Sequence, residues 1–327
     1  MISRDPQELL AQARASGDDP SSKVAIARLI SMIERGGQEA RSVGRAAYGF
    51  AGNAYTIGIT GAPGAGKSTM TDQLIGMFRA DGRVGVIAID PTSPFTGGAI
   101  LGDRVRMGAH YEDAGVYIRS MATRGHLGGL AFAVPEAIRL LDAVGFETVI
   151  VETVGVGQVE VEVAGAADST VVVVNPGWGD SVQANKAGLM EIADVFAVNK
   201  ADRPGARETC RDLESMLDLA NRTSDEWRPP VLTTSSITGD GIEDLYKAIC
   251  DHRAYLADSG KLLQRRERRI SEELQRVVLK RLEDTVQQVW DRPDVIRLRQ
   301  DTEQYRFEMY EAAERIADSV LRATDCD

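Results

Sequence analysis

Apolar residues recur along this chain of 327 residues in two different patterns. Between Tyr55 and about Leu256, short continuous apolar runs alternate with segments in which apolar residues return every three or four positions. A continuous run is typical of a strand covered on both faces, and the wider spacing is typical of a helix. The predicted strands are 56–60, 84–89, 148–151, 170–174, 195–198 and 231–233. This alternation predicts an α/β fold, a doubly wound and mostly parallel sheet with its ligand loops at the carboxyl ends of the strands.

The two ends of the chain predict helices instead. Before the first strand, an apolar stripe at helical spacing ends at Gly36-Gly37. Its members are Val24, Ile26, Leu29, Ile30 and Ile33. We therefore predict a helical extension over residues 1–50 and a central α/β domain over residues 51–258.

Residues 259–327 are predicted to form a C-terminal helical arm. The segment 261–290 is rich in Arg and Glu and has no strand pattern, and a second helix is expected over 308–323. The apolar stripes are Ile270, Leu274, Val277, Leu282 and Val289 in the first helix, and Ala313, Ile316, Val320 and Leu321 in the second. Two interpretations stay open: a helical pair that packs back on the core, or an arm that dimerises or docks a partner.

The first predicted strand leads into a glycine-rich loop that matches G-x-x-x-x-G-K-[ST], and a predicted helix follows over 68–79. The loop reads Gly61-Ala62-Pro63-Gly64-Ala65-Gly66-Lys67-Ser68, with Thr69 next. Glycines let such a loop aim backbone N–H groups at phosphates, and the helix N-terminus attracts the same anion. We expect Lys67 to reach the β- and γ-phosphate oxygens and the Ser68 hydroxyl to bind Mg²⁺. This motif predicts a P-loop domain that binds a nucleoside triphosphate.

The base is predicted by Asn199-Lys200-Ala201-Asp202, which ends a later strand. The Asp202 carboxylate can accept both N–H donors of the guanine edge, the Lys200 stem can cover the base, and Asn199 can brace the loop. Adenine does not offer that pair of donors. The auxiliary base loop is expected at Thr234-Ser235-Ser236-Ile237, where a backbone N–H would meet the guanine oxygen. Together these segments predict guanine.

Three carboxylates are candidates for the magnesium shell. Glu152 ends a strand where a Walker-B acid belongs, and Gly155 stands where a loop that senses the γ-phosphate begins. Asp90 ends the strand after the P-loop helix, and Asp103 lies in a glycine-rich loop. Because Mg²⁺ binds few protein carboxylates directly and keeps several waters, not all three can be direct ligands.

Charge and composition restrict the partners. The net charge of −11 argues against nucleic acid or an anionic membrane as the main partner. No apolar run has membrane-spanning length, and no signal core follows Met1. The three cysteines are scattered without disulfide or zinc spacing. We therefore expect a cytoplasmic protein.

Several of these segments resemble the MeaB/ArgK/MMAA group of P-loop GTPases. They are Asp90-Pro91-Thr92-Ser93-Pro94, the loop 97–107, Glu152-Thr153-Val154-Gly155-Val156-Gly157-Gln158 and Asn199-Lys200-Ala201-Asp202. Members of this group are chaperones of adenosylcobalamin-dependent acyl-CoA mutases such as methylmalonyl-CoA mutase. The likeness runs through the whole central domain, and the helical ends fit as well.

The resemblance implies a homodimer built partly through the C-terminal arm, with GTP-dependent gating of cofactor loading and rescue of inactivated mutase. It places Lys67, Ser68, Asp103 and Glu152 at phosphate and Mg²⁺ positions. Residues 179–186 match a mobile switch that meets the mutase. Within that switch, Gln183 and Lys186 are catalytic candidates that the partner would order, and a polar helix start at the surface is the competing interpretation.

Two residues depart from the family pattern, Val159 in place of a frequent Ser and Trp178 in place of a smaller residue or Met. Both lie near predicted switches, so they put the choice of partner in doubt. The cobalamin signature Asp-x-His-x-x-G is absent, since Arg124 precedes Gly125-His126 where Asp is required. We therefore expect the mutase, and not this chain, to bind cobalamin.

A phosphotransferase that passes the γ-phosphate to a protein or small molecule is the alternative function. An older labelling of the family as an amino-acid transport kinase points that way, but the sequence shows no acceptor pocket with a general base. A nickel-delivery GTPase is disfavoured, because three His and three scattered Cys offer no cluster of metal ligands.

Overall fold

The computed structural model describes residues 5–15, 17, 19–90, 108–122, 127–153, 165–177, 188, 190–219, 223 and 226–324. It divides into two compact units, Met1–Arg266 and Glu267–Asp327. The first unit contains all the described strands, and the second is helical.

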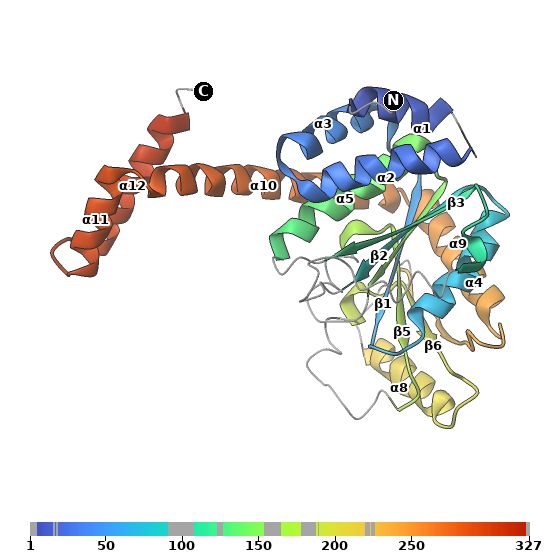
Figure 1. Cartoon of the computed structure of the whole chain (residues 1–327). Coiled ribbons are helices and arrows are strands. Elements are labelled where there is room, and N and C mark those ends of the chain that lie inside the picture. Colours follow the sequence, from blue (N-terminus) through green and yellow to red (C-terminus); the bar gives the residue numbers. More distant parts are fainter. Residues whose placement is uncertain are drawn as a thin grey trace. The chain divides into compact units, whose positions relative to one another are not determined.

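A seven-stranded parallel sheet forms the centre of the first unit, in the order β3-β2-β4-β1-β5-β6-β7. The strands are β1 (Tyr55–Gly61), β2 (Val84–Asp90), β3 (Val116–Ala122), β4 (Thr148–Thr153), β5 (Ser169–Val174), β6 (Val195–Val198) and β7 (Val231–Thr233) (Figure 1). The predicted α/β class with a parallel sheet is confirmed. Because β1 lies between β4 and β5, the loop that follows it emerges at the middle of the carboxyl edge.

The apolar pattern does not predict β3, which lies at the edge of the sheet beside β2. Its central residues Ile118, Arg119 and Ser120 are only partly buried. The Arg119 guanidinium donates to the Ser31 hydroxyl at 3.1 Å and pairs with the Glu34 carboxylate. A strand with these polar contacts lacks the continuous apolar run that identifies the inner strands.

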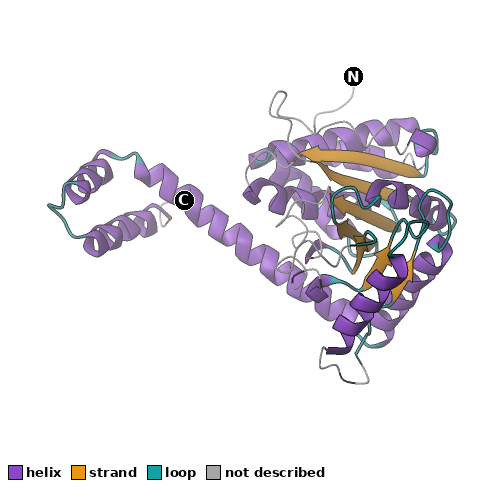
Figure 2. Ribbon diagram, turned by 90° about the horizontal axis from the view of Figure 1, so that it is seen from below, coloured by secondary structure: helices purple, strands orange, loops and turns teal. Residues whose placement is uncertain are grey.

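Helices cover both faces of the sheet (Figure 2). One face packs against α4 (Lys67–Arg79) and α9 (Ile242–Asp258), and the other against α5 (Leu127–Val144) and α8 (Ala206–Leu219). Alternate residues of one strand supply the two layers: Val171 and Val173 join the α4 side, whereas Val172 and Val174 join the α8 side. This double coverage explains why the inner strands are apolar throughout.

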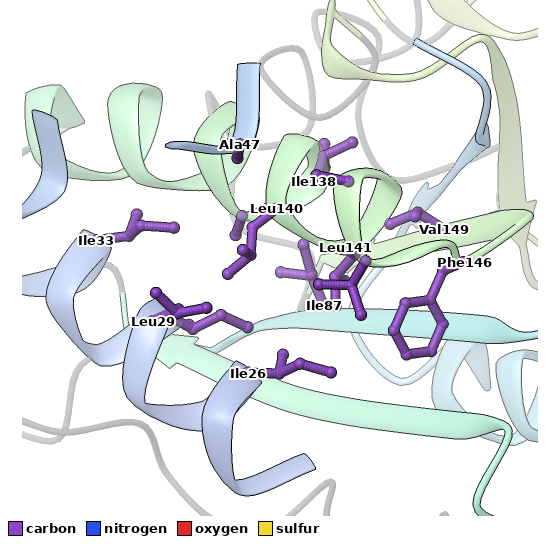
Figure 3. Close-up of a cluster of buried hydrophobic side chains, with 14 of the residues drawn as sticks. Ile26, Leu29, Ile33, Ala47, Ile87, Ile138, Leu140, Leu141, Phe146 and Val149 are labelled. Atoms are coloured by element: carbon purple, nitrogen blue, oxygen red, sulfur yellow. The ribbon is translucent and has the colours of Figure 1, made fainter. Parts of the chain in front are cut away.

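Three helices precede the sheet and pack on α5, namely α1 (Pro6–Ala15), α2 (Pro20–Arg35) and α3 (Gly37–Ala47). The Asp19 side chain caps α2 by accepting the Ser21 N–H at 2.7 Å, and Gly36 ends the helix with a φ of +74°. The core between these layers contains Ile26, Leu29 and Ile33 of α2 together with residues of α5 and the sheet (Figure 3). Val24 does not belong to the buried stripe as predicted, because it is 45% exposed.

In the second unit, the rest of α10 (Lys261–Trp290) joins α11 (Pro293–Glu303) and α12 (Met309–Thr324). Its small core contains Val286, Val289, Val295, Ile316 and Val320. The other members of the predicted stripe of α10 are at least 42% exposed. On α12, Leu321 is exposed and Ala312 takes the buried position that was predicted for Ala313. No helix in the described part of the chain is long and apolar enough to cross a membrane.

Candidate functional site

The carboxyl end of β1 and the start of α4 are joined by a tight glycine-rich loop. Gly61 has a φ of +132°, and Gly66, which precedes α4, has a φ of +93°. A Cβ atom on Gly61 would collide with the backbone carbonyl of Val173 in β5, and one on Gly66 would collide with the side-chain amide of Asn199. Glycine therefore meets both the backbone and the space requirements at these positions. The loop ends at a helix N-terminus, where an anion is stabilised.

The Lys67 ammonium folds back onto this loop. Its Nζ donates to the Gly61 carbonyl at 2.8 Å and to the Ala62 carbonyl at 3.0 Å, and the residue is 5% exposed. The other predicted phosphate-site residues occupy the same loop and the first turn of α4; these are Pro63, Gly64, Ala65, Ser68 and Thr69. The cation is thus held at the loop whose N–H groups suit a phosphate.

Ser68 and Glu152 meet beneath the start of α4. The Ser68 hydroxyl donates to Oε1 of Glu152 at 2.6 Å, and both residues are buried. Glu152 pairs with Ile59 of β1 in the strand register, which places its side chain on the face covered by α4. A hydroxyl and a carboxylate are oxygen ligands that suit Mg²⁺. Within the described ranges no cluster of three or more His, Cys, Asp or Glu side chains could hold a metal.

Asn199 joins three loops at the carboxyl edge. Its Nδ2 donates to the Ala65 carbonyl at 2.7 Å. Its Oδ1 accepts from the Ser236 N–H at 3.0 Å, from the Ser236 hydroxyl at 2.9 Å and from the Thr234 hydroxyl at 3.3 Å. The residue is 1% exposed. One buried amide therefore links the glycine-rich loop, the end of β6 and the loop after β7.

The neighbouring residues of the 199–202 segment extend this arrangement. Lys200 adopts a left-handed φ of +60°, and its Nζ donates to the Gly64 carbonyl at 2.6 Å. The Ser235 hydroxyl lies 3.4 Å from Oδ1 of the exposed Asp202. Ile237, in the same loop as Ser235, is 84% exposed. The structure thus brings together the residues predicted for the base and those predicted for the phosphates.

Some predicted site residues lie outside the described residues. These are Asp103, Gly155, Gln183 and Lys186, together with the departures Val159 and Trp178. Asp90 ends β2, but its side chain is not described. The role of each of these residues remains a prediction.

At the amino ends of the strands, opposite the glycine-rich loop, two aspartates form ion pairs with the first turns of α10. The Arg265 guanidinium pairs with both oxygens of Asp194 at 2.9 and 3.0 Å. The Arg266 guanidinium pairs with Asp168 at 2.7 Å and also donates to the Gly52 and Ala54 carbonyls at 2.7 Å. Asp168 and Asp194 immediately precede β5 and β6, and both are buried. The sequence could have suggested these carboxylates from their place before strands, but it could not indicate partners about 70 to 100 residues away.

Next to these ion pairs, Ser169, His252 and Asp194 follow one another as in a hydrolase triad, but the two ring nitrogens of the histidine are exchanged relative to such a triad. The Ser169 hydroxyl is 2.5 Å from Nδ1 of His252, and Nε2 of His252 is 3.2 Å from Oδ1 of Asp194. Ser169 and His252 are fully buried, and the serine also contacts the Tyr55 hydroxyl at 2.5 Å. Burial lowers the pKa of His252 to about 4. A serine without access to substrate cannot act as a nucleophile, so this cluster is structural.

The chain is similar to known proteins over most of its length. Residues 26–291 match the family described as "Methylmalonyl Co-A mutase-associated GTPase MeaB". A putative GTPase of Pyrococcus abyssi is 49% identical over 300 residues, which is 91% of this chain and 93% of the relative. The GTPase ArgK of Escherichia coli is 41% identical over 231 residues, which is 69% of this chain and 70% of the relative.

The fold is also similar to that of a solved structure described as an LAO/AO transport system kinase. The two chains share 27% identity with a TM-score of 0.71, and the match covers 98% of this chain and 99% of the other. The similarity therefore includes both helical ends as well as the sheet.

Proposed function

Because this chain belongs to the MeaB family of methylmalonyl-CoA mutase-associated GTPases, we propose that it hydrolyses GTP to gate adenosylcobalamin loading on a B12-dependent acyl-CoA mutase. In this proposal it also protects or reactivates that mutase. The cobalamin is bound by the mutase and not by this chain.

The observation that carries the GTP site is the pair of short contacts that joins its three parts. Asn199 connects the guanine segment to the phosphate loop through Ala65, and Ser68 connects that loop to Glu152. A nucleotide seated on the loop would have Asp202 at its base and Lys67 at its phosphates. Specific recognition of guanine and of the triphosphate would then depend on one connected set of hydrogen bonds.

In hydrolysis, the backbone N–H groups of the loop and the Lys67 ammonium would bind the β- and γ-phosphate oxygens and balance the charge that develops on them. Ser68 and Glu152 would hold Mg²⁺, with Asp90 and Asp103 as further candidates, and the bound metal would neutralise phosphate charge. We propose that Gln183 and Lys186 act in catalysis only when the mutase is bound. Intrinsic hydrolysis is then slow, and the mutase stimulates it.

We propose that the chain is a homodimer and that the second unit contributes to the interface. The apolar residues Ile270, Leu274 and Val277 of α10 are between 48% and 63% exposed, and Leu282 is 42% exposed. Such a stripe favours burial against another chain. Sedimentation of the full chain, compared with an Ile270→Ser/Leu274→Ser variant, tests this: a monomeric wild type contradicts it.

The gating function is tested by measuring GTP hydrolysis with and without each candidate client. These clients are methylmalonyl-, isobutyryl-, hydroxyisobutyryl- and ethylmalonyl-CoA mutase. We expect one of them to increase the rate at least tenfold, and Lys67→Ala to abolish turnover while the chain stays folded. A rate for the chain alone that matches a metabolic kinase, or the absence of stimulation by every client, contradicts the proposal.

The description of the solved relative as a transport system kinase favours a phosphotransferase as the second candidate. The same assay separates the two functions when the γ-phosphate carries a radioactive label. Label on inorganic phosphate supports hydrolysis, whereas label on a protein or small-molecule acceptor supports the kinase.

A further inference from the structure

Arginine and aromatic side chains are exposed on the N-terminal helices and on the turn that follows them. We call this group the arginine–aromatic patch; it consists of Arg14, Arg41, Arg45, Tyr48 and Phe50. Tyr48 and Phe50 belong to the 3-10 turn η1 (Tyr48–Phe50) and are 63% and 50% exposed. All three arginines are exposed.

The helix α3 and its C-terminal end present three members of this patch in a fixed orientation. Arg41, Arg45 and Tyr48 follow one another at spacings of four and three residues, so they share one side of the helical turn. Val43 and Ala47 are buried in the core on the opposite side. A Cβ atom on Gly44 would lie 2.9 Å from a carboxylate oxygen of Glu136, which shows how closely α3 packs on α5.

Cations also lie over both aromatic rings. The Arg14 guanidinium carbon is 3.7 Å from the centroid of the Phe50 ring, and that of Arg139 is 5.7 Å from the centroid of Tyr48. These contacts keep the rings on the surface beside positive charge and limit their freedom before a partner binds.

The positive charge of the patch is not neutralised locally. Among the described residues, no carboxylate lies within ion-pair distance of Arg14, Arg41 or Arg45. The nearby acids are engaged elsewhere: Glu39 pairs with Arg35 at 2.7 Å, and Glu136 pairs with Arg139 at 2.9 Å. A local cationic area on a chain of net charge −11 is therefore a feature that an anionic partner surface can recognise.

We propose that the arginine–aromatic patch is a docking surface for the client mutase, which meets it with a carboxylate-rich surface. Exposed Arg and Tyr on a rigid support are the residues that most often supply binding energy at protein interfaces. Nucleic acid fits less well, because the net negative charge of the chain opposes a polyphosphate backbone. The inference rests on the proposed function and adds the place where the partner binds.

The test measures binding of full-length chain to whichever of the four candidate mutases binds it most tightly, by calorimetry with a non-hydrolysable GTP analogue. Two patch variants are compared with the wild type, Arg41→Glu/Arg45→Glu and Tyr48→Ala. The matched control, Arg211→Glu/Lys247→Glu, makes the same change of charge at exposed positions of α8 and α9. We expect each patch variant to raise the Kd about tenfold or more. The control should stay within about twofold, and basal GTP hydrolysis should not change in any variant.

Salt and oligomeric state complete the test. Rising salt should weaken the wild-type complex more steeply than the Arg41→Glu/Arg45→Glu complex, because fewer charge pairs remain in the variant. If the wild type binds a mutase and both patch variants bind it with the same Kd, the patch is not the docking surface and the proposed function stands. If the wild type binds none of the four, both proposals fail. If the patch variants dissociate a homodimer in sedimentation, the surface is a self-interface and the proposal is overturned.

Discussion

The Asn199 side-chain amide and the Ala65 carbonyl are joined by a buried hydrogen bond of 2.7 Å, although 134 positions separate the two residues. Since the other side of the amide accepts from Thr234 and Ser236, its removal affects three loops at once. The shape of the loop 61–68 and the shape of the loop after β7 are therefore coupled through a single side chain.

Asn199→Ala should weaken both stability and nucleotide binding. The variant leaves the Ala65 carbonyl and the Ser236 N–H without this partner, which we expect to cost about 2–3 kcal/mol in the free energy of unfolding. Urea unfolding measures that loss, and calorimetry should show at least tenfold weaker GDP binding. Asn199→Asp is the matched control, because it keeps the acceptor for Ser236 but places a carboxylate oxygen against Ala65. If the free energy of unfolding of Asn199→Ala is within about 0.5 kcal/mol of the wild-type value, which is the usual effect of a surface substitution, the coupling is contradicted.

Glu152→Gln should raise the magnesium requirement of GTP hydrolysis. The amide oxygen of Gln can still accept the Ser68 hydroxyl, whereas the negative charge that favours Mg²⁺ is lost. We expect the Mg²⁺ concentration for half-maximal turnover to rise about tenfold or more, with little change in thermal unfolding. A titration with Mg²⁺ at saturating GTP makes the measurement. An unchanged half-maximal concentration would mean that Glu152 does not serve the metal.

Asp202→Asn should relax the preference for guanine. The carboxylate that can accept two N–H groups becomes an amide that offers one acceptor and one donor, so the exocyclic amine of guanine loses its partner. Competition binding should show the ratio of GTP to ITP affinity falling about tenfold towards unity, in keeping with a lost charged hydrogen bond. Discrimination equal to that of the wild type would contradict the assignment of the base site.

The sequence predicts those elements whose apolar pattern lies within a short stretch of the chain. The strands β6 and β7 have the predicted bounds. All of β6 is buried, as its continuous apolar run predicts, whereas the edge strand β7 is only partly buried. The edge strand β3 escapes prediction because Arg119 interrupts its pattern to reach α2. The stripe on α10 has helical spacing, but spacing cannot show whether a partner helix covers it.

The residues of the candidate site also differ in whether a local motif identifies them. The loop 61–68 and the segment 199–202 can be named as candidates from the sequence alone, because the residue types that suit phosphate and guanine stand together in the chain. Hydrogen bonds between distant segments, such as those of Asn199 with Ala65 and Ser236, come only from the fold. The ion pair of Arg265 with Asp194 likewise joins residues 71 positions apart, and no local sequence pattern indicates such a pair.

The buried His252 should make stability depend on pH in a defined window. Burial is the main cause that lowers its pKa from 6.5 to about 4, and the positive charge of Arg265 adds to it, while Asp194 and Asp168 act in the opposite direction. The Trp227 and Tyr255 rings also pack beside the imidazole. Below pH 6.5 the unfolded chain binds a proton that the folded chain does not, so the free energy of unfolding falls as the pH drops from 6.5 towards 4.

This one group lowers the free energy of unfolding by on the order of 3 kcal/mol between pH 6.5 and 4, and it has no such effect above pH 6.5. Carboxylates that titrate in the same range affect the wild type and a His252→Gln variant alike, so the difference between the two curves isolates the histidine. Urea unfolding at pH 7.5, 6, 5 and 4.5 should show the wild type losing stability faster than the variant. Parallel curves over that range would mean that the imidazole accepts its proton in the folded state as readily as in the unfolded chain, and the buried cluster at Asp194 would then need a different account.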